Sequence, residues 1–150
     1  MVEREAVIEK VEGWLEKLGF NYAKEQVDSE GGGKEPVLYI RFRGKAKQPD
    51  FDVYIIARGD WILCRARLAT ADQIPKAKRA EFYRALLNAV FRYSEVSFSA
   101  DDDGNIFVEC DIHRTSDLRT FEEEFKSLPV GMGIFAEELA PKFGIKLGKG

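Results

Sequence analysis

The chain has 150 residues, of which 45% are hydrophobic and 33% are charged, and its formal net charge at pH 7 is −3. This length and apolar fraction are typical of one globular domain, so we expect a single domain over residues 1–150. The acidic balance disfavours nucleic-acid binding, and no apolar run approaches the length of a membrane span. The charged first residues lack a signal-peptide pattern, and together these features predict a soluble, cytoplasmic protein.

The N-terminal segment is predicted to be an amphipathic helix. Its apolar residues recur at spacings of three and four from Val7 to Leu18 and therefore share one face. Gly19 follows the last of them, at the position where a left-handed cap ends many helices.

Residues 21–36 are polar and include three consecutive glycines. We expect a flexible loop here, with a short strand near residues 20–27 as the alternative. Lys34 follows the glycines, but Asp28 and Glu35 stand where a phosphate-binding loop needs Gly and Ser or Thr, so no such loop is predicted.

Period-two alternation of apolar and polar residues predicts three strands, over residues 37–43, 51–58 and 61–69. Such alternation gives each strand one buried face and one wetter face, as in an antiparallel sheet that is covered on one side. Gly59, between the second and third of these strands, is typical of a tight hairpin turn, so we expect the two strands to pair.

A second helix is predicted to begin near Pro75, a residue favoured in the first helical turn. Two further strands follow, over residues 96–100 and 106–112, joined by a hairpin turn at Asp102–Asn105. We expect the helix that begins near Pro75 to pack one apolar stripe against the core. This stripe consists of Ala80, Tyr83, Leu86, Leu87, Val90 and Phe91.

The C-terminal part is predicted to be helical from residue 116 to residue 128, with a break at Pro129–Gly133. A final short helix is expected near Ile134–Leu139, ending around Pro141. The Gly- and Lys-rich residues 144–150 are expected to form a frayed tail.

The predicted fold class is therefore α+β, with a single antiparallel five-stranded sheet, helices on one face, and the order α-β-β-β-α-β-β-α-α. Its most specific stretches are Leu86-Leu87-Asn88, Phe98 at the start of a strand, the run Asp101 to Ile106, and Asp117-Leu118 opening a helix. This order and these stretches resemble the type III secretion chaperone-like fold, and in detail the YbjN-type family of sensory transduction regulators. The resemblance implies a cytosolic, non-enzymatic, often dimeric protein that holds another polypeptide.

The acidic turn fits part of a calcium-binding loop when Gly104 is aligned with the glycine of that motif. Cys110 then occupies the position that needs a bidentate Glu, and strands flank the turn where the motif has helices. A plain hairpin turn is the better interpretation, and no metal is predicted there.

The remaining candidates for chemistry are few. Cys64 and Cys110 lie at inward-facing strand positions and are interpreted as buried thiols, not as nucleophiles or ligands. His113 faces outward at the end of a strand, without a Ser or Cys to activate. We therefore expect no catalytic residue, no metal site and no cofactor.

The outward-facing strand positions carry aromatic and arginine side chains, which can grip a peptide or stack on bases. Asp52, Glu109 and Asp111 lie among them, so a solvated face with cross-strand ion pairs is the alternative interpretation. The candidate partner-binding residues are Tyr39, Arg41, Tyr54, Ile56, Leu63, Arg65, Arg67 and Phe107.

The leading functional hypothesis is a protein-binding or chaperone-like domain that forms a homodimer and presents this face to a polypeptide partner. The alternative hypothesis is single-stranded nucleic-acid binding through the same face, which the acidic total charge disfavours. An enzyme comes last, because no nucleophile–base pair, dinucleotide fingerprint or metal cluster is found in the sequence.

Overall fold

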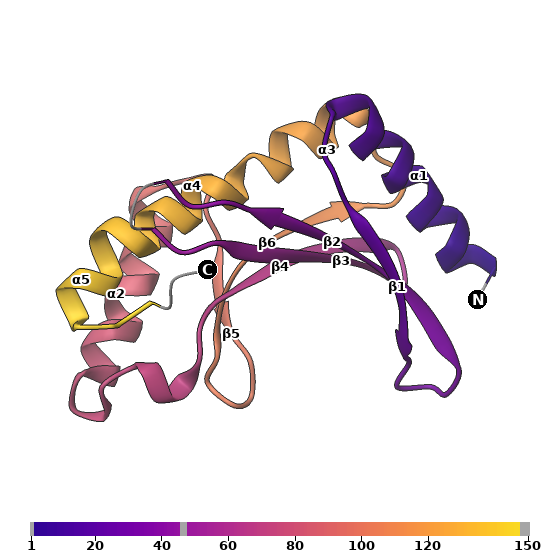
Figure 1. The fold of residues 1–150 in the computed structure, drawn as a ribbon. Coiled ribbons are helices and arrows are strands. Elements are labelled where there is room, and N and C mark those ends of the chain that lie inside the picture. The colour runs from indigo at the N-terminus through magenta and orange to yellow at the C-terminus, as the bar shows by residue number, and fades with distance from the viewer. Residues whose placement is uncertain (1, 46–47, 148–150) are drawn as a thin grey trace.

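The computed structural model describes residues 2–45 and 48–147. Six strands form one sheet in the order β1-β2-β3-β4-β6-β5, and all neighbouring strands are antiparallel (Figure 1). The strands are β1 (Ala23–Asp28), β2 (Lys34–Phe42), β3 (Phe51–Arg58), β4 (Trp61–Ala69), β5 (Phe98–Ala100) and β6 (Ile106–His113).

The helices α1, α3 and α4 cover one face of this sheet, whereas α2 packs against β5 at its end (Figure 1). Two short 3₁₀ turns, Ala71–Gln73 and Lys76–Lys78, precede α2, and a π-helical turn, Phe135–Leu139, connects α4 to α5. The α-helices are α1 (Val2–Leu18), α2 (Arg79–Arg92), α3 (Leu118–Phe125), α4 (Ser127–Ile134) and α5 (Ala140–Phe143). The α+β class and the antiparallel sheet are as predicted.

The prediction of five strands was wrong, because the expected flexible loop over residues 21–36 forms most of a β-hairpin. The short strand considered near residues 20–27 is present as β1, Ala23–Asp28. β1 pairs along its whole length with β2, from Ala23 opposite Tyr39 to Asp28 opposite Lys34. β1 is an edge strand with almost fully exposed side chains, so it lacks the alternation by which strands are recognised in sequence. Only residues 29–33 form the turn, in which Gly32 and Gly33 both adopt positive φ angles.

The predicted break at Pro129–Gly133 was also wrong. The backbone stays helical through Lys126 and Phe135, so α3, α4, the π-helical turn and α5 form one nearly continuous run. Pro129 lacks the N–H that would bond to the Phe125 carbonyl, and this missing bond coincides with the irregular turn at Lys126. The proline therefore lies where the series of helical backbone hydrogen bonds is already interrupted.

The expected frayed tail is ordered at its beginning. Gly144 caps α5 with φ +67° and Ile145 is buried, with its N–H bonded to the Ala140 carbonyl at 2.9 Å. Leu147 also packs on the core. The rest of that predicted tail, residues 148–150, lies outside the described residues.

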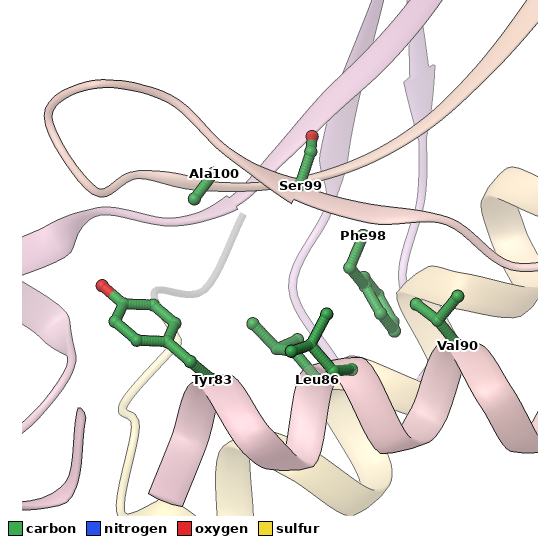
Figure 2. Close-up of a pocket in the computed structure, with 7 residues that line it drawn as sticks. Tyr83, Leu86, Val90, Phe98, Ser99 and Ala100 are labelled. Carbon is green, nitrogen blue, oxygen red and sulfur yellow. The ribbon is translucent and has the colours of Figure 1, made fainter. Parts of the chain in front are cut away.

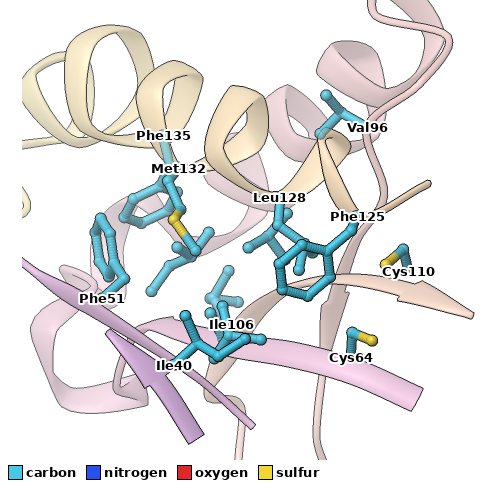
Figure 3. Close-up of a cluster of buried hydrophobic side chains, with 14 of the residues drawn as sticks. Ile40, Phe51, Cys64, Val96, Ile106, Cys110, Phe125, Leu128, Met132 and Phe135 are labelled. Atoms are coloured by element: carbon cyan, nitrogen blue, oxygen red, sulfur yellow. The ribbon is translucent and has the colours of Figure 1, made fainter. Parts of the chain in front are cut away.

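The core lies between the inner face of the sheet and the C-terminal helical run (Figure 3). In this view Phe125, Leu128 and Met132 project from the helices toward the sheet, where Ile40 and Ile106 lie (Figure 3). The period-two pattern correctly predicted the inward residues of β2, β3, β4 and β6, which are buried except for half-buried Phe42. In β5 the prediction was wrong for Ala100, which is exposed, and Phe98 is only partly buried. The sheet therefore has one face committed to packing and one face left without helices.

The predicted inner stripe of α2 was mostly wrong. The helix buries Phe82, Leu86 and Ala89, while Tyr83, Leu87 and Phe91 are exposed. Apolar residues occupy more than half of this helix's circumference, so their spacing cannot decide which stripe faces the core.

A buried carboxylate ties α1 to the sheet. Glu35 has a side chain only 5% exposed, and its Oε1 accepts a hydrogen bond from Arg58 Nη2 at 2.7 Å. Its Oε2 accepts a second bond from Arg58 and one from Arg4 Nη1 at 2.9 Å. The hydrogen bonds from Arg58 are the main reason why the pKa of Glu35 is lowered, and burial only partly opposes them.

We predict that Glu35→Gln lowers the free energy of unfolding at pH 7 by about 1–3 kcal/mol, because it removes charge-assisted hydrogen bonds. A lowered folded-state pKa means that this stabilisation is complete above about pH 4.3, the ordinary Glu value, and is lost as pH falls through the lowered pKa. Urea unfolding between about pH 7 and pH 2 should therefore show the two proteins converging in acid. Glu25→Gln, at an exposed site on β1, is the control. A constant difference across this pH range would contradict the prediction.

Gly131 marks the closest approach of α4 to β6. A Cβ atom there would lie 2.5 Å from Val108 Cγ2 and 3.1 Å from Val96 Cγ1, whereas one at Gly133 would meet nothing within 4 Å. We predict that Gly131→Ala destabilises the protein by about 1–3 kcal/mol through overpacking. Gly133→Ala should instead stabilise it by up to about 1 kcal/mol, because alanine favours helix. Thermal unfolding of both variants checks this, and equal effects would contradict it.

Candidate functional site

The outer face of the sheet gathers the residues that the sequence singled out. Strand register places Tyr39 opposite Tyr54, Tyr54 opposite Arg65, and Arg65 opposite Glu109 in one row across four strands. Flanking rows contain Ile56 opposite Leu63, Arg41 opposite Asp52, and Arg67 opposite Phe107. All eight candidate residues therefore lie on one surface.

Two of the arginines on this face are held by carboxylates. Arg41 donates to both oxygens of Asp52, at 2.8 and 3.1 Å, and these bonds lower the pKa of Asp52. Arg65 Nε donates to Glu109 Oε2 at 2.7 Å, and both of these side chains are half-buried. The expected cross-strand ion pairs are thus present, and these two arginines are already neutralised.

Arg67 differs from its neighbours. Its side chain is exposed, and among the described residues no carboxylate oxygen lies within 4.0 Å of its guanidinium. It lines an open hollow of about 490 Å³, together with Tyr39, Asp50, Phe51, Asp52, Tyr54, Asp101, Asn105 and Phe107. The hollow therefore combines one unneutralised cation with aromatic rings and hydrogen-bond acceptors.

Four outward-facing apolar residues of this face are less exposed than their strand positions predict. Ile56 is buried by its neighbours, and Leu63, Tyr54 and Phe107 are only partly exposed. Burial raises the pKa of Tyr39, and it is also the main cause of the raised pKa of Asp111. The face is thus a packed polar surface with aromatic edges and no broad hydrophobic area.

Sequence reasoning missed Trp61 as a member of this surface. Its ring is 49% exposed and meets the His113 ring edge-on, with 5.3 Å between the ring centroids. Position parity on the strand would have found it, since Trp61 is two residues before Leu63 and shares its face. His113 Nδ1 also lies 2.7 Å from Thr115 Oγ1.

The acidic turn next to the hollow uses its own carboxylate. Asp101 Oδ1 accepts hydrogen bonds from the backbone N–H groups of Asp103 and Asn105, and its Oδ2 accepts one from Asn105 Nδ2. These bonds lower the pKa of Asp101 and make the segment a hairpin turn, as interpreted from sequence. Within residues 2–45 and 48–147, no group of three or more His, Cys, Asp or Glu side chains is placed to hold a metal ion.

The fold is similar to that of several solved structures. YbjN from E. coli matches with a TM-score of 0.61 over 94% of this chain and 95% of that one, at 13% identity. The chain has a YbjN and type III secretion chaperone-like fold. The heterodimeric ExoU–SpcU complex from the type III secretion system of Pseudomonas aeruginosa matches with a TM-score of 0.55, 17% identity and coverages of 86% and 97%.

The ExsC–ExsE complex matches with a TM-score of 0.54 and 14% identity, over 85% of this chain and 88% of that one. At these identities the likeness concerns the fold alone. No protein-family model and no curated protein matches the sequence. In the part of the chain that the structure describes, no helix combines the length and hydropathy needed to cross a bilayer.

The two thiols lie on the inner face, away from the candidate surface. Cys64 and Cys110 are direct neighbours across β4 and β6, both are buried, and burial raises the pKa of Cys64. We predict that neither thiol reacts with an aromatic disulfide reagent until the protein unfolds, whereas an added thiol at exposed Ser97 (Ser97→Cys) reacts at once. Rapid titration of either native thiol in buffer would contradict this.

Proposed function

We propose that the protein is a chaperone-like binding domain that holds a polypeptide segment on the outer face of its sheet, in the cytoplasm, and does not catalyse a reaction. The main support is the hollow around Arg67, with Tyr39, Tyr54 and Phe107 beside it. The fold supports it further, since two of the similar structures are complexes of two polypeptides.

The chemistry of the hollow favours a segment with an acidic and an aromatic or apolar side chain. The Arg67 guanidinium can bind a partner carboxylate in a charge-assisted pair, because among the described residues it has no carboxylate partner, unlike its neighbours Arg41 and Arg65. The rings of Tyr54 and Phe107 offer apolar contact area at low cost in conformational entropy.

Single-stranded nucleic acid fits this surface less well. Asp50, Asp52 and Asp101 line the same hollow as Arg67, so a phosphate backbone, with one charge per nucleotide, would bring several charges against three carboxylates, whereas a peptide needs to place only one acidic group at the Arg67 guanidinium. The aromatic rings are also partly covered, which limits their use for stacking bases.

We also propose that the domain functions as a homodimer. Within the described residues the outer face of the sheet offers no broad apolar patch for such a contact, because Ile56 is buried and Leu63 and Phe107 are only partly exposed. The dimer contact is therefore expected on another surface of the molecule.

We predict that peptides selected from a random display library bind the wild-type protein and lose at least about tenfold in affinity with Arg67→Glu or Tyr54→Ala, as expected for contact residues at an interface. The measurement is fluorescence anisotropy of a labelled peptide. Arg119→Glu is the matched control, because Arg119 is exposed on α3 in the helix layer and its pair with Glu123 is solvent-exposed.

Binding that survives Arg67→Glu, or a library that yields no binder, would contradict the proposed function. Salt-sensitive binding of a labelled oligo(dT) that depends on Tyr54 would favour the nucleic-acid alternative instead.

A further inference from the structure

Two charged side chains in the hollow of the outer face have no partner of opposite charge. Arg67 and Asp101 both line this hollow, and both are exposed. Within residues 2–45 and 48–147, no carboxylate oxygen lies within 4.0 Å of the Arg67 guanidinium, and no basic nitrogen lies within 4.0 Å of the Asp101 carboxylate. The hollow thus offers one positive and one negative group to a ligand.

We propose that the hollow recognises a dipolar segment of the polypeptide partner, in which an acidic side chain binds Arg67 and a basic side chain binds Asp101. The inference rests on the proposed function and deepens it, because it adds a second charged contact and sets its distance from the first. A uniformly acidic segment would meet repulsion at Asp101, and a uniformly basic one at Arg67, so both bind less tightly than a segment of mixed charge.

The orientation of Asp101 follows from β5, which ends directly before it. Figure 2 shows Phe98 of this strand directed toward α2 and Ser99 directed away from it. Ser99 pairs with Phe107, which lines the hollow. Backbone pairing continues past the end of β5, because the Asp101 N–H bonds to the Asn105 carbonyl at 3.1 Å. Strand alternation therefore places Asp101 on the same side as Ser99, at the hollow.

Hydrogen bonds fix the Asp101 carboxylate in place and leave it able to accept one more. Its three donors are the backbone N–H groups of Asp103 and Asn105 and the Asn105 side-chain amide. Asn105 is held in turn by the Ala71 N–H, which bonds to its Oδ1 at 3.1 Å. A carboxylate has about four acceptor positions, so one position on Asp101 is open to a ligand. The same hydrogen bonds lower the pKa of Asp101, so this group is charged at neutral pH.

The other two carboxylates of the hollow are already engaged. Asp52 is bound through both oxygens by Arg41. The Asp50 side chain is only 17% exposed, its Oδ1 accepts a backbone N–H at 2.9 Å, and its Oδ2 lies 3.9 Å from Arg43 Nη1. A basic side chain that enters the hollow therefore finds its best partner at Asp101.

Strand spacing sets the distance between the two charged groups. Arg67 lies on β4, β6 lies beside it, and Asp101 continues β5 on the far side of β6. Neighbouring strands are about 4.8 Å apart, so the two backbones are separated by roughly 10 Å across the sheet. An extended segment advances about 3.3 Å per residue, so its acidic and basic residues would be two or three positions apart. A free amino acid is too short, because both its charged groups are attached to the same carbon atom.

The test uses the peptides that a random display library yields against the wild-type protein. Most of them should contain an acidic and a basic residue two or three positions apart. Asp101→Asn removes the charge and keeps an oxygen that accepts the two backbone N–H groups, so circular dichroism should show an intact fold. By fluorescence anisotropy, this variant should bind such a peptide about fivefold more weakly, as expected for the loss of one exposed ion pair.

Asp102→Asn is the matched control. Asp102 is exposed in the same turn but lies outside the set of residues that line the hollow, and the variant has the same change in net charge. Its affinity should stay within about twofold of the wild-type value. In a double-mutant cycle, replacing the basic residue of the peptide by Gln should weaken binding to the wild-type protein and have little further effect on Asp101→Asn.

Binders that lack a basic residue, equal effects of Asp101→Asn and Asp102→Asn, or strictly additive effects in the cycle would each overturn the dipolar segment. The assay also separates this inference from the proposed function. Binding that depends on Arg67 but not on Asp101 overturns the inference alone. A library without binders, or binding that survives Arg67→Glu, overturns the proposed function and the inference together.

Discussion

The inner face of the sheet is covered by α1 and by one long apolar stripe along the C-terminal helical run. The side chains that form it lie about one or two helical turns apart and are buried against the strands. This run and α1 contact the sheet over β2, β3, β4 and β6, whereas α2 packs at the end of the sheet against β5. The stripe consists of Phe121, Phe125, Leu128, Met132 and Phe135. The bare outer face of the sheet and the exposed side of α2 both follow from this packing.

The parts of the fold that could be predicted from sequence are those where burial is one-sided. In β3 and β6, polar and apolar residues alternate because one face packs and the other meets water, so bounds and inner residues follow from period two. β1 could not be predicted in this way, because an edge strand with exposed side chains is held by backbone hydrogen bonds, and these leave no pattern in the sequence.

The helix errors have a different physical origin. Pro129 and Gly131 are locally unfavourable in a helix, yet α4 passes through both because its stripe is buried and Gly131 permits close approach to Val108. In α2, the residue pattern correctly predicted a helix but could not predict which side of it is buried, because tertiary packing determines which of the two apolar stripes contacts the core. The candidate site could be predicted as a set of outward-facing positions. The ion pairs of Arg41 with Asp52 and of Arg65 with Glu109 depend on cross-strand geometry, as does the lack of a carboxylate partner for Arg67 among the described residues.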